Sequence, residues 1–309
     1  MGHLELSPMG FGSIQLSYAN QVAVTLGGSV IRMSAMSTEN QSNNVTVAIA
    51  GAAGRMGQRL VALCDQTDGL QLSAAFDRAG HEHIGADSGQ LSAGVANDVA
   101  IKDSLDGGPN VMIDFTLPEA TQANIALCVE RNVALIIGTT GLSEADHAAI
   151  DEAAKSIPVV QAPNMSLGVN LLFALAARTA ARLGDDYDIE IVEAHHRYKK
   201  DAPSGTAMGI AEAICKATDK DINKDLDYGR HGDDEVRERG TIGMHAVRIG
   251  DCVGEHSAYF AALGERIELR HVATTRDTFA RGALRAALWI HGKPAGRYTM
   301  ADVLGLNDE

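Results

Sequence analysis

The chain has 309 residues, with 26 Lys and Arg against 40 Asp and Glu, so its formal net charge is −14. This length predicts two domains at about 150 residues each, and the acidic balance argues against nucleic acid or an anionic membrane surface as a partner. With 45% hydrophobic and 21% charged residues, the composition is that of a globular protein and excludes disorder of the whole chain.

The cysteines and the apolar runs of the sequence indicate the cellular compartment of the protein. The four cysteines are widely spaced, without a C-x-x-C pair: Cys64, Cys128, Cys215 and Cys252. They therefore predict neither a zinc site nor a disulfide exchange motif, and they favour a reducing compartment. No apolar run reaches 18 residues and the first basic residue is Arg32, so we expect no membrane span and no secretory signal. We expect a cytoplasmic protein.

Residues 1–44 differ in character from the rest of the chain. They contain only Glu5, Arg32 and Glu39 as charged side chains and show no sustained hydrophobic period. We interpret this segment as a flexible N-terminal extension on which function does not depend.

From residue 45 apolar strands alternate with helical patterns. The run VTVAIA (45–50) is a β-branched strand that ends in glycine, and a helical pattern follows at 55–66. Further apolar strands are predicted at 70–76, 111–116, 133–140 and 157–164, with helices at 119–131 and 143–155. This alternation predicts an α/β fold with a Rossmann-like, doubly wound parallel sheet over residues 45–166.

The pattern changes after residue 166. A long apolar helix at 169–183, a strand at 187–194 and a helix after Pro203 are followed by alternating strands at 241–251, 255–263 and 265–274. Such alternation is typical of strands with one solvated or partner-covered face. We expect residues 167–275 to form a smaller α+β domain with an open mixed sheet, for substrate binding and oligomerisation. The amphipathic helix at 275–292 is expected to return to the first domain, which residues 276–309 would complete.

The segment GAAGRMG places Gly51, Gly54 and Gly57 between a strand and a helix. Glycines there allow a tight turn and let backbone N–H groups approach a pyrophosphate. Because the spacing departs from G-x-G-x-x-G at Ala53, the loop alone leaves simple helix–strand packing open. Asp77 lies 20 residues after Gly57, where a carboxylate can bind ribose hydroxyls. Its neighbour Arg78 can contact a 2′-phosphate, so NADH and NADPH both stay possible.

Three more short segments end predicted strands: DFT (114–116), GTTG (138–141) and APNM (162–165). Each alone could be an ordinary turn. Ligands of open α/β sheets bind at the carboxyl ends of the strands, so together these segments predict a floor for the ribose and nicotinamide.

The segment EAHHRYKKDAPSGTA (193–207) gathers imidazole, guanidinium and ammonium groups directly before a helix. Histidine exchanges protons near neutral pH, and lysine can attract an anion and donate a proton. The helix start at Ser204, Gly205 and Thr206 offers N–H groups and hydroxyls to a substrate carboxylate. A plain N-cap with a solvated charge run is the alternative. Adjacent histidines on a strand point to opposite faces, so we expect no metal site.

Eight segments together resemble the 4-hydroxy-tetrahydrodipicolinate reductase family, also called dihydrodipicolinate reductases, of lysine and diaminopimelate biosynthesis. They are VAIAGAAGRMGQRL, IDFT, IIGTTG, APNMSLGVN, EAHHRYKKDAPSGTA, GTIG, GDCVGEH and TTRDTFARGALRAALW. The resemblance is collinear from about residue 45 to residue 309. The HHR-x-K-x-DAPSGT string is its most specific part.

The resemblance implies that NADPH or NADH reduces a cyclic dicarboxylate, whose 4-hydroxyl group is lost as water, to tetrahydrodipicolinate. His195 would donate or accept a proton and Lys199 would donate one. The implied substrate contacts are His196, Ser204, Gly205 and Thr206. The implied cofactor contacts are Gly51, Ala52, Ala53, Gly54, Arg55, Met56, Gly57, Asp77, Arg78, Phe115, Thr116, Gly138, Thr139, Thr140, Ala162, Pro163, Asn164 and Met165. Arg276 matches a family arginine near the hinge, and the family assembles as a homotetramer through the open sheet.

Two other functions stay open from the residues. One is a nicotinamide-dependent dehydrogenase that acts on another small amino or keto acid with the same two-domain plan. The other is a non-catalytic NAD(P)H sensor, which would bind the dinucleotide without turnover. The histidine and lysine side chains of segment 193–207 argue against both.

Overall fold

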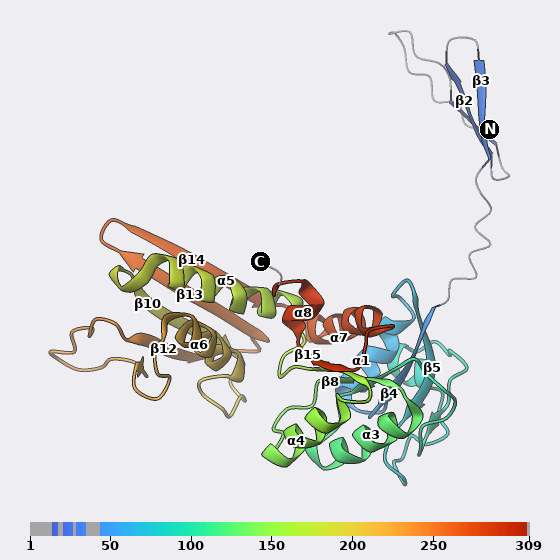
Figure 1. Cartoon of the computed structure of the whole chain (residues 1–309), viewed down its shortest axis with the longest axis horizontal. Coiled ribbons are helices and arrows are strands. Elements are labelled where there is room, and N and C mark those ends of the chain that lie inside the picture. Colours follow the sequence, from blue (N-terminus) through green and yellow to red (C-terminus); the bar gives the residue numbers. More distant parts are fainter. Residues whose placement is uncertain (1–13, 18–20, 27–28, 35–43, 308–309) are drawn as a thin grey trace. The chain divides into compact units, whose positions relative to one another are not determined.

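The computed structural model describes residues 14–17, 21–26, 29–34 and 44–307 (Figure 1). The chain divides into two compact units, Met1–Asn43 and Asn44–Glu309. The first unit contains an antiparallel sheet of order β1-β2-β3, formed by β1 (Ile14–Ser17), β2 (Gln21–Leu26) and β3 (Ser29–Ser34). The sequence pattern did not predict these strands. The expected flexibility of residues 1–44 falls largely outside the described residues and stays a prediction.

The second unit begins with a seven-stranded, wholly parallel sheet of order β15-β9-β8-β7-β4-β5-β6. Its strands are β4 (Val45–Ala50), β5 (Leu70–Phe76), β6 (Ile101–Lys102), β7 (Val111–Asp114), β8 (Ala134–Ile137), β9 (Pro158–Gln161) and β15 (Gly296–Tyr298). Every residue of β7 and β8 is buried, as central parallel strands covered on both faces require. The predicted doubly wound sheet is confirmed.

Helices cover both faces of this sheet (Figure 1). One layer contains α1 (Arg55–Cys64) and α7 (Asp277–Ile290), and the other contains α3 (Pro118–Arg131) and α4 (Glu144–Ala153). The short helices α2 (Ser88–Ala93) and α8 (Met300–Leu304) complete what we call the first lobe. Among the described residues, none of the helices combines the length and the apolar character needed to cross a membrane.

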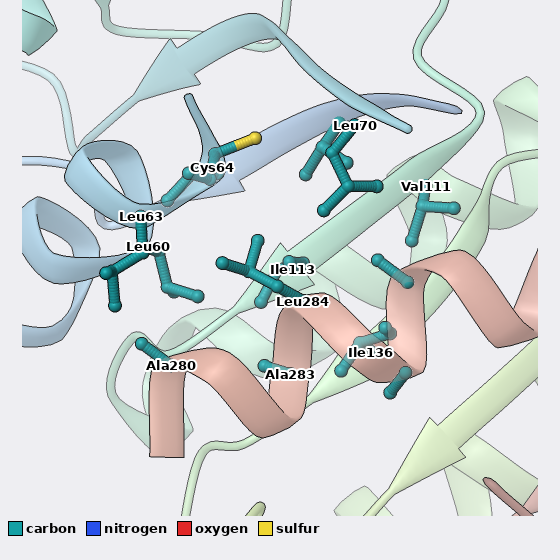
Figure 2. Packing of buried hydrophobic residues seen from close by; sticks show 14 of the residues in the cluster. Leu60, Leu63, Cys64, Leu70, Val111, Ile113, Ile136, Ala280, Ala283 and Leu284 are labelled. Carbon is teal, nitrogen blue, oxygen red and sulfur yellow. The ribbon is translucent and has the colours of Figure 1, made fainter. Parts of the chain in front are cut away.

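Helix α7 returns to the first lobe from the far end of the chain. Its Ala283 and Leu284 pack with Leu60 of α1 and Ile113 of β7 in one buried cluster (Figure 2). Alanines on α7 let the helix lie close to the sheet, while the leucines fill the space between them. Helix α7 therefore packs against the first lobe, and the residues before it lie beside that lobe. That residues 276–309 complete this domain stays a prediction.

The second lobe is a mixed sheet of order β11-β12-β10-β13-β14, with two helices on one face (Figure 1). Its elements are α5 (Leu167–Leu183), β10 (Asp188–His195), α6 (Gly205–Thr218), β11 (Leu226–Asp227), β12 (Ile242–Arg248), β13 (Gly254–Ala262) and β14 (Glu265–Ala273). A short 3-10 turn, η1 (Gly184–Asp186), precedes β10. The exact residues that divide the two lobes stay a prediction.

The central strand β10 alternates strictly. Ile189 and Ile191 pack beneath the helices, and Glu193 and His195 continue on the same face. The opposite face carries Glu190, and its edges expose Val247 to 43% and Val272 to 46%. The alternation thus carries the polar pair Glu193 and His195 to the end of the helix-covered face.

Candidate active site

The glycine turn follows β4 directly. Gly51 has φ of +70°, a conformation that favours glycine. A Cβ at Gly57 would lie 2.0 Å from the carbonyl oxygen of Gly51, so only glycine lets α1 start this close to the turn. Gly54 is the N-cap of α1, and its lack of a side chain leaves the first N–H groups of the helix open to an anion.

Asp77 lies at the end of β5, beside this turn. Its Oδ2 accepts a hydrogen bond from the N–H of Ala53 at 3.1 Å, and its Oδ1 accepts one from the N–H of Arg78 at 2.9 Å. A carboxylate has further lone pairs, so the predicted contact with ribose hydroxyls is compatible with these bonds. Arg78 itself is exposed, which leaves it free to meet a 2′-phosphate.

The two loops after β7 and β8 are tied together by Asp114. This fully buried carboxylate accepts hydrogen bonds from Thr116 N at 2.8 Å, Thr116 Oγ1 at 2.6 Å, Thr139 Oγ1 at 3.2 Å and Asn124 Nδ2 at 3.0 Å. A Cβ at Gly138 would lie 2.3 Å from the ring of Phe115, so the ring needs a glycine beneath it. Thr116 and Thr139 therefore anchor these loops, and Phe115 and Gly138 form their surface.

A cavity of about 730 Å³ opens in front of these loops. Eight of the predicted cofactor residues line it: Arg55, Met56, Phe115, Gly138, Thr140, Pro163, Asn164 and Met165. The other residues that line the cavity were not among the predicted cofactor contacts: Gln58, Arg59, Ser92, Arg276, Asp277 and Phe279. The other predicted residues lie outside this lining: Gly51, Ala52, Ala53, Gly54, Gly57, Asp77, Arg78, Thr116, Thr139 and Ala162.

The chemistry of this cavity fits a nicotinamide dinucleotide. Its volume lies within the range of cofactor and ligand sites, roughly 300 to 1,000 Å³. Arg55 and Arg276 supply positive charge beside the N-terminus of α1, where a pyrophosphate would be stabilised. Phe115 supplies apolar surface of the kind that a planar ring requires. The residues present can therefore hold NADH or NADPH.

Segment 193–207 begins on β10 in the second lobe and ends on α6. His195 is only 8% exposed, and its Nδ1 lies 2.6 Å from Oε2 of Glu193, which is fully buried. Burial lowers the pKa of His195, while its hydrogen bond with the Glu193 carboxylate acts in the opposite direction. His195 is therefore neutral near pH 7 and can accept or pass on a proton.

Lys199 follows in the loop between β10 and α6. Its Nζ donates to both carboxylate oxygens of Asp201, at 2.9 and 2.8 Å. Its side chain is 21% exposed, so the ammonium group keeps access to solvent or a ligand. Asp201 thus holds the ammonium group of Lys199, whose positive charge contributes to lowering the pKa of His195.

The start of α6 presents backbone donors. Helix geometry leaves the N–H groups of Gly205 and Thr206 without acceptors inside the helix. A Cβ at Gly205 would meet nothing within 4 Å, so there is open space beside it. Nδ1 of His196 is buried and has no hydrogen-bond partner in the structure. These features match what a substrate carboxylate requires.

Ser204 lies at the predicted helix start, where it is the N-cap of α6. It is 1% exposed, and its hydroxyl accepts the N–H of Ala207 at 3.2 Å and lies 3.0 Å from Nε2 of His256. The hydroxyl is therefore engaged inside the second lobe as an N-cap. Its predicted substrate contact stays a prediction.

Asn164 connects the two predicted sites. It lines the cavity of the first lobe, and its Nδ2 donates a 3.0 Å hydrogen bond to Oγ1 of Thr206 on α6. At the return to the first lobe, Asp277 forms a two-point ion pair with Arg59, at 2.7 and 2.8 Å. The side chains of His195 and Lys199 are not part of the cavity lining. The structure thus brings the start of α6 to the edge of the cavity.

Several polar residues of this site were not predicted from the sequence: Glu193, Asp201, Arg248 and His256. Glu193 could have been found, because it lies two residues before His195 on a strand and shares its face. Arg248 could not, because it meets Glu193 only through the parallel pairing of β10 with β12. Within residues 44–307, no three His, Cys, Asp or Glu side chains come together as a metal site.

Two family models match this chain. The model described as "Dihydrodipicolinate reductase, N-terminus" matches residues 45–165, and "Dihydrodipicolinate reductase, C-terminus" matches residues 168–304. Curated relatives from Alkalilimnicola ehrlichii and Hahella chejuensis are named 4-hydroxy-tetrahydrodipicolinate reductase. They are 50% identical over 263 and 268 residues, which span 84% of this chain and 98% of each relative.

Solved structures share the fold. A dipicolinate-bound dihydrodipicolinate reductase from Paenisporosarcina sp. TG-14 has a TM-score of 0.66 at 24% identity, over 84% of this chain and 98% of that one. An amine dehydrogenase from Mycobacterium smegmatis has a TM-score of 0.56 at 13% identity, over 83% and 95%. The two lobes are thus a plan that several oxidoreductases share. Because both family models and the curated relatives match almost all of the chain from residue 45 onward, the chain belongs to the dihydrodipicolinate reductase family.

Proposed function

We propose that this chain reduces 4-hydroxy-tetrahydrodipicolinate to tetrahydrodipicolinate with NADH or NADPH, with loss of water, in diaminopimelate and lysine biosynthesis. The observation that carries the proposal is the hydrogen bond from Asn164 to Thr206. It brings the helix start that suits a carboxylate to the edge of the cavity that suits a dinucleotide.

The second lobe would hold the substrate. The free N–H groups of Gly205 and Thr206 would bind one carboxylate at the positive end of α6. His196, with its unpartnered buried Nδ1, would contact the other. A doubly anionic ring suits this lobe because Lys199 and Arg197 add positive charge to the same loop.

His195 and Lys199 would supply the proton chemistry. Reduction of an imine-like ring adds negative charge to the substrate, and a nearby ammonium group stabilises that charge. Lys199 would donate the proton, and the neutral His195 would accept or relay one. General acid–base catalysis of this kind contributes about 10² to 10⁴ in rate.

The first lobe would hold the dinucleotide, which supplies the reducing equivalent when bound. The N-terminus of α1, with Arg55, would bind the pyrophosphate, and Asp77 the adenosine ribose. The guanidinium group of Arg78 would pair with a 2′-phosphate, so both NADH and NADPH are usable. Because His195 and Lys199 lie outside the cavity lining, the lobes would close about the segment around Arg276, which would exclude water and align the reactants.

Two further properties belong to this proposal. The face of the mixed sheet that carries Glu190 exposes Val247 and Val272, which suits a covered subunit surface, and we place a homotetramer contact there. Four dispersed free cysteines suit a reducing compartment, and we place the protein in the cytoplasm.

The test is a steady-state assay with freshly generated cyclic substrate and NADH or NADPH in parallel, in which nicotinamide absorbance and the product are both followed. The proposal predicts cofactor oxidation that matches tetrahydrodipicolinate formation. Faster oxidation with a small keto acid or imino acid would favour a different dehydrogenase. Tight dinucleotide binding without turnover of any of these substrates would favour a sensor. Either result would overturn the proposal.

A further inference from the structure

Glu193 is a buried carboxylate with no spare oxygen. Its Oε2 lies 2.6 Å from Nδ1 of His195 and accepts Nη1 of Arg248 at 2.9 Å. Its Oε1 accepts the N–H of Ser204 at 3.0 Å and Nη2 of Arg248 at 2.9 Å. The side chain is 0% exposed, so these four donors replace water entirely. A two-point pair with Arg is the geometry that fixes a carboxylate most firmly.

These contacts determine which nitrogen of His195 is protonated. Burial alone would raise the pKa of Glu193, but the hydrogen bonds from Arg248 and His195 outweigh it and leave the pKa below its ordinary value. An ionised carboxylate only accepts hydrogen bonds. Nδ1 of His195 must therefore carry its proton, and Nε2 is the nitrogen that can gain or lose one.

Gly254 leaves space beside Nε2 of His195. A Cβ at Gly254 would lie 3.0 Å from Nε2, so a larger residue there would crowd this nitrogen. The ring of His256 meets that of His195 edge to face, with centroids 5.1 Å apart. Among the charged groups around His195, Glu193 favours the protonated ring, whereas Lys199 and Arg248 oppose it. The orientation of the imidazole thus depends on one carboxylate.

The same carboxylate also reaches the substrate side. Its bond to the N–H of Ser204 fixes the residue that caps α6. Arg248 donates in addition to the carbonyl oxygen of Asp201 at 2.6 Å, and the side chain of Asp201 holds Lys199. His195, the start of α6 and the lysine loop are therefore connected through Glu193 and its arginine.

We propose that Glu193 is a positioning residue that holds His195 with Nδ1 protonated and Nε2 free, and that fixes the start of α6 in register with it. The proposal rests on the proposed role of His195 in the reaction. Glu193 would not touch the substrate, and its effect on rate would act through the histidine. This is the arrangement by which a buried carboxylate selects a histidine tautomer in other catalytic sites.

The test is Glu193→Gln, measured by steady-state kinetics and by ¹⁵N NMR of the His195 ring. Glutamine would keep its carbonyl oxygen toward Arg248 and Ser204 and turn its NH₂ group toward Nδ1 of His195. The proton of the neutral ring would then move to Nε2. We expect a fall in kcat of about 10²-fold or more, with a much smaller change in the KM of the cyclic substrate. The NMR spectrum should change from the Nδ1–H to the Nε2–H tautomer.

Glu190→Gln is the matched control. Glu190 lies on the same strand and, like Glu193, pairs with guanidinium groups and a histidine. Its partners are Arg230, Arg237 and His245, and it lies on the opposite face of the sheet. Glu190→Gln should leave the Nδ1–H tautomer of His195 unchanged. If Glu193→Gln fails to fold, the double variant Glu193→Gln with Arg248→Met removes both charges of the ion pair and should give the same tautomer and rate.

The proposal is overturned if His195 keeps its Nδ1 proton in both variants, or if the tautomer changes while kcat stays within about threefold of the parent chain. The NMR measurement needs no substrate. An unmodified chain that shows the Nδ1–H tautomer but does not reduce the cyclic substrate would therefore refute the proposed function and not the contact between Glu193 and His195.

Discussion

Nε2 of His256, on β13, lies 3.0 Å from the hydroxyl oxygen of Ser204, the residue that caps α6. The hydroxyl already accepts the N–H of Ala207, so its own hydrogen is available to the histidine. Burial, with a smaller contribution from His195, lowers the pKa of His256 to about 3. His256 is therefore a neutral acceptor that supports the helix start proposed to bind substrate.

This depressed pKa predicts how stability depends on pH. In the unfolded chain His256 would titrate near 6.5, so its contribution is fully present above that pH. It is lost as pH falls from about 6.5 toward 3, at up to about 1.4 kcal/mol per pH unit. His195 and His271, whose pKa values are also lowered, act in the same direction. The His256→Asn variant should therefore lose about 1 kcal/mol less than the parent chain between pH 6 and pH 5.

The measurement is urea unfolding followed by circular dichroism at several pH values. The exposed His291→Asn variant is the control and should keep the pH dependence of the parent chain. The same pH dependence in His256→Asn and the parent chain would show that His256 does not remain neutral in the fold.

Gly57→Ala should weaken dinucleotide binding. Its Cβ would lie 2.0 Å from the carbonyl oxygen of Gly51, so the turn and the start of α1 must separate. We expect at least a tenfold loss of NADH affinity and a loss of about 1 to 3 kcal/mol in stability, as for other cases of steric overpacking. Gly108→Ala, where a Cβ would meet nothing within 4 Å, is the matched control. Calorimetric titration that gave equal affinity for both variants would contradict the placement of the pyrophosphate.

Arg78→Ala should change the preference between the two cofactors. Arg78 is exposed beside Asp77, where its guanidinium can pair with a 2′-phosphate that only NADPH carries. We expect the KM for NADPH to rise about tenfold and that for NADH to change by less than about twofold. Lys155→Ala, another exposed basic residue, should alter neither value. An unchanged NADPH to NADH ratio would remove Arg78 from the site.

His195→Ala and Lys199→Ala should slow the chemical step and spare cofactor binding. Both residues lie in the second lobe, away from the cavity lining. We expect kcat to fall by about 10² to 10⁴, while NADH affinity stays within about twofold of the parent value. Single-turnover kinetics and fluorescence titration separate the two effects. A normal single-turnover rate in either variant would reject the role assigned to that residue.

The hydrophobic patterns of the sequence predict most of the helices and strands. Apolar β-branched runs such as residues 45–50 and 133–140 predicted the central parallel strands, because burial on both faces requires them to be apolar throughout. The shortest elements were missed. Strands β6 and β15, of two and three residues, are too short to show a period, and their pairing depends on neighbours far along the chain.

The site was predictable only as far as local chemistry reaches. The glycine turn and segment 193–207 can be recognised in the sequence from their residue types and spacing. The bonds between Arg248 and Glu193, and between Asn164 and Thr206, join residues 55 and 42 positions apart, and no local pattern specifies them. The place of Ser204 before a helix predicts its position at the helix start, whereas its contact with His256 depends on the sheet of the second lobe.

The most direct test of the account is a crystal structure of the chain with NADH and dipicolinate, an aromatic dicarboxylate that cannot be turned over as the substrate would be. We predict a closed cleft in which one carboxylate accepts the N–H groups of Gly205 and Thr206, and in which Lys199 and Nε2 of His195 lie within hydrogen-bond distance of the ring or its substituents. The nicotinamide should face that ring at the edge of the cavity where Asn164 contacts Thr206. If dipicolinate bound elsewhere, with His195 and Lys199 turned to bulk solvent, the proposed reaction site would be wrong.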